Sequence, residues 1–363
     1  MIITRLKQLD WVLIGAVVLL VGLGLISLYS SSVGRHNFLN FEKQIVFFVL
    51  GLILMFIFSF LDWRVWRENN ILVLILYAIC ILSLIGLYFL APEIRGVRKW
   101  YKIGLFSIDP VEFTKFVLII ILAKYFSRWH VEIYRIRHIL FSGCYIFLPG
   151  ILIFFQPDFG SVLILLLMWL GVLLVSGIKL RHFLILVVIG VLVLSLSWVF
   201  LMKDYQKERI ISFIAPRDPL GINWNQNQAK IAIGSGGIWG KGLLKGSQTQ
   251  YGFLPEPQTD FIFAALAEET GLVGVTILLL LFLILIWRLF KIALISQSNF
   301  PRLFNIGVII ILISQIFINL GMNLGILPII GIPLPLVSYG GSSLFSIFLI
   351  LGVSQSIRLT YLK

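Results

Sequence analysis

The sequence predicts an all-α protein that crosses a membrane about ten times and forms a single domain over residues 1–363. Composition is the first reason: 60% of the residues are apolar and 12% are charged, against about 45–50% and about 25% in soluble proteins. The second reason is that apolar runs near the ~20 residues needed to cross a bilayer recur along the chain. The sequence lacks the long period-two alternation of barrel strands, and helices satisfy their own backbone groups in lipid.

Ten windows of mostly apolar residues are the predicted spans of this polytopic protein. The fifth and sixth are separated only by QPDFG, a predicted tight turn at Pro157 and Gly160. Cys80 and Cys144 fall inside apolar runs, which favours ordinary packing over a disulfide or a metal site. The spans are predicted at 11–30, 42–61, 71–90, 110–126, 139–155, 160–178, 183–202, 262–290, 303–326 and 338–357.

Lys and Arg predict the orientation, because short cytoplasmic loops are enriched in them. The short turns at 31–41, 156–160 and 327–337 hold only Arg35. We therefore predict an N-in, C-in topology with one long extracytoplasmic loop, about 203–260, between the seventh and eighth spans. The formal charge of +13 then reflects the side of the membrane that the basic residues face. We expect no nucleic-acid partner. The basic residues placed inside are Arg5, Lys7, Arg64, Arg67, Lys124, Arg128, Arg135, Arg137, Lys179, Arg181, Arg288, Lys291, Arg302, Arg358 and Lys363.

Two basic clusters nevertheless lie on the predicted outer face. They favour an anionic ligand there, with contact to anionic lipid headgroups as the alternative. One cluster precedes the fourth span and the other lies in the long loop. Their members are Arg95, Arg98, Lys99 and Lys102, then Lys203, Lys207, Arg209, Arg217, Lys230, Lys241 and Lys245.

The long loop contains two distinct patterns. DYQKERIISFIAPRDP has apolar residues at helical spacing, which predicts an amphipathic interfacial helix ended by Pro216 and Pro219. NQAKIAIGSGGIWGKG follows, with close-set glycines near Lys230 and Lys241. Such glycines allow a backbone nest for an anion, and a flexible loop explains them as well.

Charged residues open the fourth and sixth spans. Asp109, Pro110 and Glu112 fit a capping box with proline at the first helical position. Glu112 and Lys115 are spaced to neutralise each other, and both a structural ion pair and a substrate-cavity pair remain open. Asp158 is either a cap for the sixth span or a functional acid.

Residues 319–343 are rich in amides, prolines and hydroxyls. Such sequence at membrane depth must be buried in protein or line a cavity. A serine nucleophile is not expected, because the histidines lie outside any outer-face cluster, and no group has zinc-site spacing. The polar residues are Asn319, Asn323, Ser338, Tyr339, Ser342 and Ser343.

The stretch FLPEPQTDFIF places Asp260 at the outer mouth of the eighth span. Six motifs resemble, in the same order, those of the SEDS (shape, elongation, division and sporulation) family. They are GVRKW, QPDFG, YQKERIISF, AIGSGGIWGKG, LPEPQTDFIFAALAEETGLVG, which contains Asp260, and GIPLPLVSYGGSS. The resemblance covers essentially the whole chain. GIPLPLVSYGG has the elongation form rather than the GLTLPLISYGG of division-type members.

The resemblance implies a bacterial plasma-membrane glycosyltransferase that polymerises lipid II into peptidoglycan at the outer face. It implies a class B penicillin-binding protein as partner, alongside membrane lipids and other elongation proteins. It also implies a divalent cation, Mg or Mn, held mainly by the substrate pyrophosphate rather than by protein ligands.

The resemblance further implies that Asp260 is the essential acid, and we expect it to act as general base in an inverting displacement of undecaprenyl pyrophosphate. Gln258 stands where a histidine is common, and DPVE replaces the usual QPSE, which leaves the role of Asp109 open. The rival functions are a lipid II flippase or transporter and a non-catalytic scaffold for the transpeptidase. The expected substrate-binding residues are Arg98, Trp100, Glu112, Lys115, Asp158, Arg209, Gln228, Lys230, Asn323, Ser338, Tyr339, Ser342 and Ser343.

Overall fold

The computed structural model describes residues 6–93, 98–104, 106–129, 136–200, 204–214 and 223–361. Several predictions therefore lie outside the described residues. They concern Arg5, Arg95, Arg135, Lys203, Pro216, Arg217, Pro219, Lys363 and the side chain of Arg209.

Within these ranges, a helix occupies each of the ten predicted spans. Eight are long and apolar enough to cross a membrane, whereas α8 has 17 residues and α6 carries four charged residues. The all-α class is confirmed, and the number of spans stays a prediction. The helices are α2 (Trp11–Arg35), α3 (Leu39–Phe60), α5 (Asn70–Leu90), α6 (Pro110–Trp129), α7 (Ile136–Phe155), α8 (Phe159–Val175), α9 (Leu180–Phe200), α13 (Ile262–Ile295), α14 (Asn299–Leu324) and α15 (Gly341–Tyr361).

Shorter elements connect the long helices. The loop after α9 contains α10 (Asp204–Ile214), α11 (Trp224–Gly236) and α12 (Ser247–Gln250), so the helix predicted in DYQKERIISFIAPRDP is present. Helix α4 (Arg64–Glu68) lies between α3 and α5. Strands β1 (Tyr101–Ile103) and β2 (Phe106–Ile108) form an antiparallel hairpin that the sequence did not predict, because three residues are too few to show a period.

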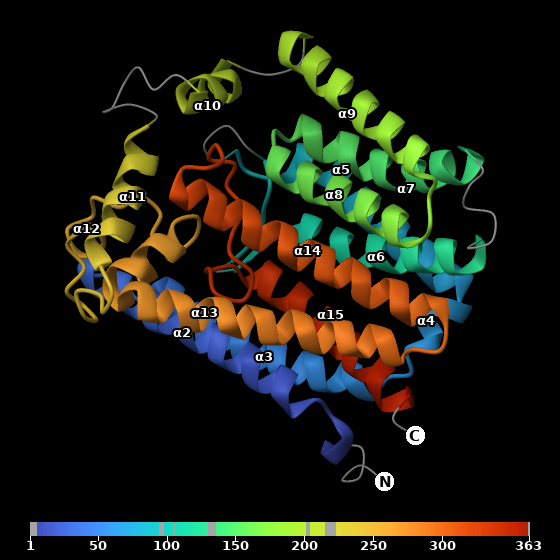
Figure 1. Cartoon of the computed structure of the whole chain (residues 1–363), viewed down its shortest axis with the longest axis horizontal. Coiled ribbons are helices and arrows are strands. Elements are labelled where there is room, and N and C mark those ends of the chain that lie inside the picture. Colours follow the sequence, from blue (N-terminus) through green and yellow to red (C-terminus); the bar gives the residue numbers. More distant parts are fainter. Residues whose placement is uncertain are drawn as a thin grey trace.

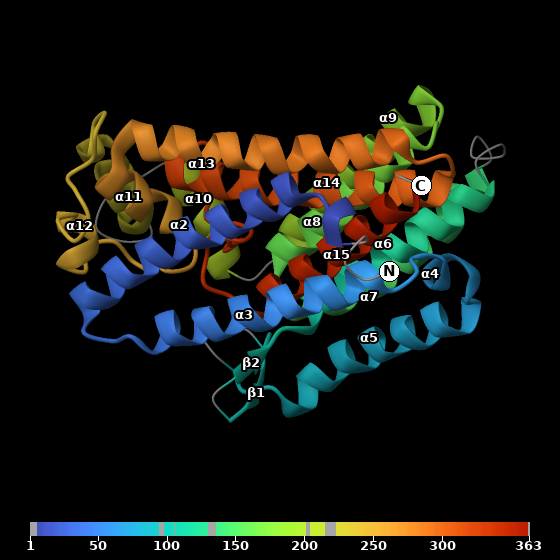
Figure 2. The same cartoon turned by 90° about the horizontal axis from the view of Figure 1, so that it is seen from below.

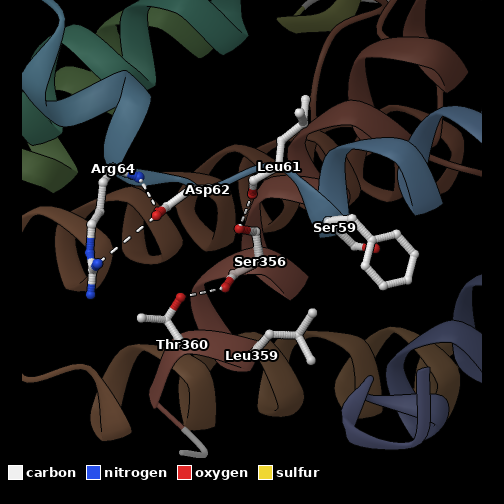
Figure 3. A pocket seen from close by; sticks show the side chains of 8 residues that line it. Ser59, Leu61, Asp62, Arg64, Ser356, Leu359 and Thr360 are labelled. Atoms are coloured by element: carbon white, nitrogen blue, oxygen red, sulfur yellow. Dashed lines mark hydrogen bonds and ion pairs between the residues drawn. The ribbon is translucent and has the colours of Figure 1, made fainter. Parts of the chain in front are cut away.

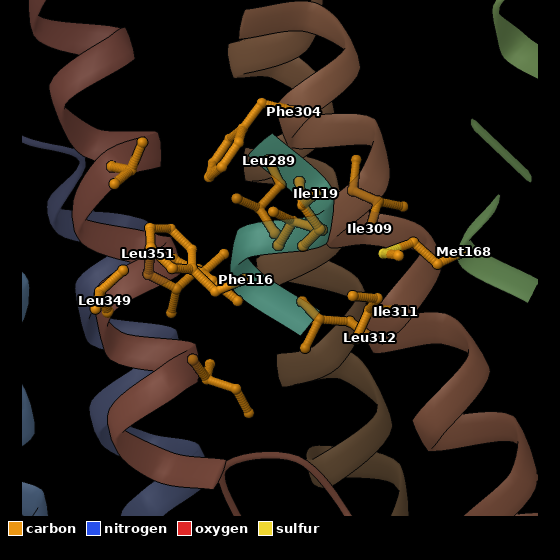
Figure 4. Packing of buried hydrophobic residues seen from close by; sticks show 14 of the residues in the cluster. Phe116, Ile119, Met168, Leu289, Phe304, Ile309, Ile311, Leu312, Leu349 and Leu351 are labelled. Atoms are coloured by element: carbon orange, nitrogen blue, oxygen red, sulfur yellow. The ribbon is translucent and has the colours of Figure 1, made fainter. Parts of the chain in front are cut away.

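Helix α6 is the centre of the bundle. It contacts α5, α7, α8, α14 and α15, and 14 of its 20 residues are buried. In Figure 4, Phe116 and Ile119 of α6 lie among Leu289, Leu312 and Met168 of its neighbours. Lipid is as apolar as leucine, so close packing rather than apolar burial holds such helices together.

Glycine allows helices α3 and α15 to pack closely. A Cβ at Gly51 would lie 2.4 Å from the Phe348 ring, and one at Gly352 would lie 2.7 Å from the Met55 carbonyl oxygen. Larger residues at either position would force the two helices apart.

The two ends of the bundle differ. The start of α2 and the end of α15 lie at one end, and α11 and α12 lie at the other (Figures 1 and 2). An N-in, C-in topology requires this arrangement, while which end faces the cytoplasm stays a prediction. Helix α9 lies outermost in Figure 1, and only 6% of its most apolar window is buried.

Candidate active site

The main chain directly before α13 is held by amide side chains of α14. The Nδ2 atoms of Asn319 and Asn323, which are both buried, donate to the Asp260 carbonyl oxygen at 3.1 and 2.9 Å. Asn323 Oδ1 also accepts from the Ala264 amide at 3.3 Å. Asn323, predicted to contact substrate, therefore positions the peptide that carries Asp260.

The segment between α14 and α15 holds the two preceding carbonyl groups. Ser338 Oγ donates to the Thr259 carbonyl at 2.6 Å, and the Tyr339 amide donates to the Gln258 carbonyl at 2.8 Å. Three successive carbonyl oxygens, from 258 to 260, thus accept hydrogen bonds from residues 319–339. The acidic turn is consequently fixed at its backbone.

The Asp260 side chain is half-buried, and the nearby Phe261 and Phe263 are buried. Its Oδ2 faces Gly331, where an added Cβ would lie 3.8 Å away. Lys230 is exposed on α11, with its Nζ 3.0 Å from a Cβ added at Gly325, the C-cap of α14. Gln228 is buried on the same helix, which contacts α13 and α14.

A second group of charges lies where α6 and α8 begin, and we call it the buried charge cluster. Lys99 Nζ lies 2.7 Å from Asp158 Oδ2 and 3.5 Å from Asp109 Oδ2. Glu112 and Lys115 form the predicted i,i+3 ion pair at 2.7 Å. Lys99 is 15% exposed at its side chain, and the other four are below 10%. Lys99 was counted in a basic loop but was absent from the predicted site.

Three members of the buried charge cluster lie outside the helices, and their surroundings shift their pKa values. Burial raises the pKa of Asp109 to about 6 despite the nearby Lys99 ammonium. Burial also disfavours ionisation of Asp158, but Lys99 and Ser161 outweigh it and hold the pKa of Asp158 below its ordinary value. For Lys99, burial opposes the charge, yet Asp158 and Asp109 raise its pKa.

Local capping explains part of this geometry. Asp158 Oδ1 accepts from the Ser161 amide at 3.2 Å, which confirms it as the cap of α8. Asp109 Oδ1 accepts from the Val111 amide at 3.0 Å. The predicted capping box is wrong in one respect: the Asp109 amide donates to Ser342 Oγ at 2.8 Å, not to Glu112.

The segment 330–342 lies between Asp260 and the buried charge cluster. Ser338 bonds the peptide before Asp260, and Ser342, four residues later, bonds Asp109. On α8, a Cβ at Gly160 would lie 2.8 Å from Ile332, so this glycine serves packing rather than the predicted turn. Ser338 and Ser342 can be at most about 14 Å apart along the chain, which places both acidic groups beside one segment. Tyr339 within this segment and Ser343 directly after it are half-buried.

Two other predicted substrate-binding residues, Arg98 and Trp100, lie at the margin of the buried charge cluster. Arg98 Nη1 donates to the Tyr88 carbonyl at 2.9 Å, and its Nη2 pairs with Glu93 at 3.3 Å. Trp100 is half-buried, with its ring centroid 6.0 Å from Lys99 Nζ. Arg98 is therefore directed toward the end of α5 rather than into the cluster.

The glycine-rich loop is anchored by two residues that the sequence reasoning missed, Glu268 and Glu269. Their carbonyl oxygens accept hydrogen bonds from the Lys241 and Gly242 amides, each at 3.0 Å. The fully buried Glu268 carboxylate accepts from Lys241 Nζ at 3.1 Å and from the amides of Gln248 and Thr249 at 2.8 and 3.1 Å. A Cβ at Gly236 would lie 2.1 Å from the Ala267 carbonyl oxygen. Gly236 is therefore needed for the close contact between α11 and α13. In the sequence, two adjacent glutamates inside an apolar run, Glu268 and Glu269, were the feature that could have indicated this anchor.

Among the described residues, the cavity drawn in Figure 3 and the metal-ligating side chains do not form a rival site. Figure 3 shows a cavity of about 190 Å³ where α3 and α15 end. Its Ser356 donates to the Leu61 carbonyl and Arg64 pairs with Asp62, so its polar groups are engaged. Within the described residues, no group of three or more His, Cys, Asp or Glu side chains is arranged to hold a metal ion.

The chain is similar to known proteins over most of its length. A family model described as a cell cycle protein, for FtsW, RodA and SpoVE, matches residues 10–360. The peptidoglycan glycosyltransferase MrdB of Escherichia coli (strain K12) is 39% identical over 321 residues, covering 87% of this chain and 85% of its own.

Solved structures share the fold over nearly the full length. The crystal structure of the rod shape determining protein RodA of Thermus thermophilus matches with a TM-score of 0.71 at 30% identity, covering 96% of each chain. A structure described as the structural coordination of polymerization and crosslinking by a peptidoglycan synthase complex matches with a TM-score of 0.82 at 32% identity, covering 97% and 98%. The chain therefore belongs to the FtsW, RodA and SpoVE family, the SEDS family that its motifs resemble.

Proposed function

We propose that this membrane protein is a peptidoglycan glycosyltransferase that polymerises lipid II during cell-wall elongation, with Asp260 as general base. The observation that carries the proposal is the fixed backbone of residues 258–260, which presents a half-buried carboxylate directly before α13. Relatives that carry the name peptidoglycan glycosyltransferase, such as MrdB, support it.

The chemistry requires one proton transfer and one displacement. Asp260 accepts the proton of the 4-hydroxyl of a GlcNAc, whose oxygen attacks the anomeric carbon of a MurNAc. The undecaprenyl pyrophosphate leaves from the opposite face with the bonding electrons, which inverts the anomeric centre. A base must lie within hydrogen-bond reach of the proton it takes, and the fixed turn reduces the freedom of that carboxylate.

Cationic side chains would stabilise the leaving diphosphate. Lys99 and Lys115 of the buried charge cluster and Lys230 of α11 are the candidates whose positions are described, with Arg98 at the margin. The proposal includes a divalent cation, Mg or Mn. The oxygens of the substrate diphosphate, rather than protein side chains, would be its main ligands.

The relatives support the cellular setting that we propose. We place the chain in the bacterial plasma membrane, with the Asp260 end outward. A class B penicillin-binding protein is the proposed partner, and the match to a peptidoglycan synthase complex that couples polymerization with crosslinking supports it. Membrane lipids and other elongation proteins complete the proposed setting.

The decisive experiment is polymerisation of lipid II by the purified protein, with and without the transpeptidase. Asp260→Asn should insert and fold like the wild type, because the hydrogen bonds from Asn319 and Asn323 go to the backbone carbonyl, which the substitution retains. Its polymerisation rate should fall by about 10²–10⁴-fold, the usual contribution of a general base.

Asp62→Asn, an exposed carboxylate beside Arg64 where α3 ends, is the matched control and should polymerise normally. Wild-type rates from Asp260→Asn would remove Asp260 as the base. Absence of polymer from the wild-type protein under every condition would favour a flippase or a scaffold instead.

A further inference from the structure

The buried charge cluster contains more carboxylates than ammonium groups. Asp109, Glu112 and Asp158 face Lys99 and Lys115, so the fully ionised cluster has a net charge of 2 − 3 = −1. All three carboxylate residues are less than 10% exposed. An uncompensated charge is costly in such surroundings, and a buried acid commonly takes up a proton instead.

The three carboxylates are not equally compensated. Asp158 receives Lys99 at 2.7 Å together with the Ser161 hydroxyl at 2.7 Å, and Glu112 receives Lys115 at 2.7 Å. Asp109 receives the Val111 amide at 3.0 Å, but Lys99 approaches it only to 3.5 Å. Asp109 is therefore the member that gains most from a proton.

We propose that Asp109 is the proton-binding member of the buried charge cluster and that its charge controls how tightly the chain holds the diphosphate of its lipid donor. The second half of this inference rests on the proposed function, and the first half does not. The exchange is simple: the Asp109 carboxylic acid releases its proton to solvent and becomes a carboxylate. The direction of its pKa, raised by burial to about 6, agrees with the geometry.

The surroundings of Asp109 determine the sign of the effect. The charged groups described around it are Lys99 from the loop after α5, Asp158 from the turn before α8, and Glu112 with Lys115 on α6. Ser342 of α15 contributes a neutral hydroxyl. With Asp109 protonated the cluster is neutral, and with Asp109 ionised it carries one negative charge. An anionic diphosphate near segment 338–342 is repelled by the ionised form, which also attracts Lys99.

A readout independent of activity tests the proton. Infrared difference spectra between pH 5 and pH 8 should show loss of a protonated-carboxyl band in the wild-type protein. Asp109→Asn should lack this change, and the control Asp62→Asn should retain it. If Asp109→Asn does not fold, Asp109→Gln replaces it as a second neutral variant. An unchanged band in the neutral variant would overturn the first half.

The KM for lipid II tests the second half. Between pH 5 and pH 8 the wild-type KM should rise on the order of tenfold, as one added charge roughly 10 Å from an anion predicts at an effective dielectric constant of about 20. Asp109→Asn should keep a low KM at both pH values, whereas its kcat should vary with pH as that of the wild type does. A KM that rises equally in Asp109→Asn and wild type would overturn this half. Failure of the wild type to polymerise would refute the proposed function, while the infrared result would still decide the proton site.

Discussion

Two buried ionic groups at opposite ends of the bundle have opposite imbalances. Near the start of α2, the Asp10 carboxylate, 1% exposed, receives Arg288 Nε at 2.7 and 2.9 Å and Arg358 Nη1 at 3.5 Å. This triad joins α2, α13 and α15 with two cations and one anion. The buried charge cluster at the other end has two cations and three anions.

The chemistry of the excess charge explains how the two ends differ. A guanidinium group does not lose its proton in proteins, so the triad keeps its charge at every physiological pH and acts as a permanent link between helices. A carboxylate in excess can take up a proton, so the buried charge cluster can change its charge. The same number of uncompensated charges thus gives a fixed contact at one end and a titratable one at the other.

Asp10→Asn should cause the largest loss of stability. Removing the carboxylate leaves two guanidinium groups next to each other without a counterion, and breaking a buried pair in this way costs about 3–5 kcal/mol. The loss should be equal at pH 5 and pH 8, because neither arginine titrates. Thermal unfolding in detergent measures it, with Asp62→Asn of the exposed pair as a control that loses about 0–1 kcal/mol. Equal melting temperatures for the two variants would show that the triad is not a link.

Lys99→Met should cost less, and its cost should depend on pH. Without the ammonium, Asp109 and Asp158 lose their shared cation, but either can become protonated, which limits the loss to about 1–3 kcal/mol at pH 8. Both acids then have raised pKa values in the folded state. The variant should therefore be most stable at low pH and lose stability as the pH rises from 5 to 8.

Unfolding of Lys99→Met at several pH values, beside Lys99→Met with Asp158→Asn, checks this pattern. The double variant should recover part of the loss, because it removes one unpaired carboxylate. If the loss of stability were the same at pH 5 and pH 8, the buried charge cluster would be a fixed ionic contact like the triad.

These two groups also mark the limit of prediction from sequence. Neighbours along one helix were predictable: the Glu112–Lys115 pair and the Asp158 cap follow from spacing alone. Lys99 and Asp158 are on different elements, and Asp10 and Arg288 are 278 positions apart. Such pairs depend on helix packing, which composition and periodicity do not encode. Asp10 also resembles an ordinary N-cap, a role that it fulfils for Leu13.

The site around Asp260 shows the same limit. Apolar runs and motif order were enough to place Asp260 at the start of α13. The partners of its peptide were not predictable, because an amide or hydroxyl in a broken segment can equally line a cavity or bind backbone. The structure assigns Asn319, Asn323 and Ser338 to the backbone.

Ser338→Ala should have the smallest effect on stability. Ser338 lies in the segment between Asp260 and the buried charge cluster, and its hydroxyl carries no charge. The change removes the hydrogen bond to the Thr259 carbonyl and leaves the Leu334 amide without its acceptor, a loss of about 1 kcal/mol. Ser354→Ala is the matched control, because that buried hydroxyl donates to the Ile350 carbonyl of its own helix. Polymerisation should fall at least tenfold in Ser338→Ala, since a base displaced by a fraction of an ångström loses its alignment. Equal activity in the two serine variants would show that the carbonyl contacts stabilise the fold without positioning Asp260.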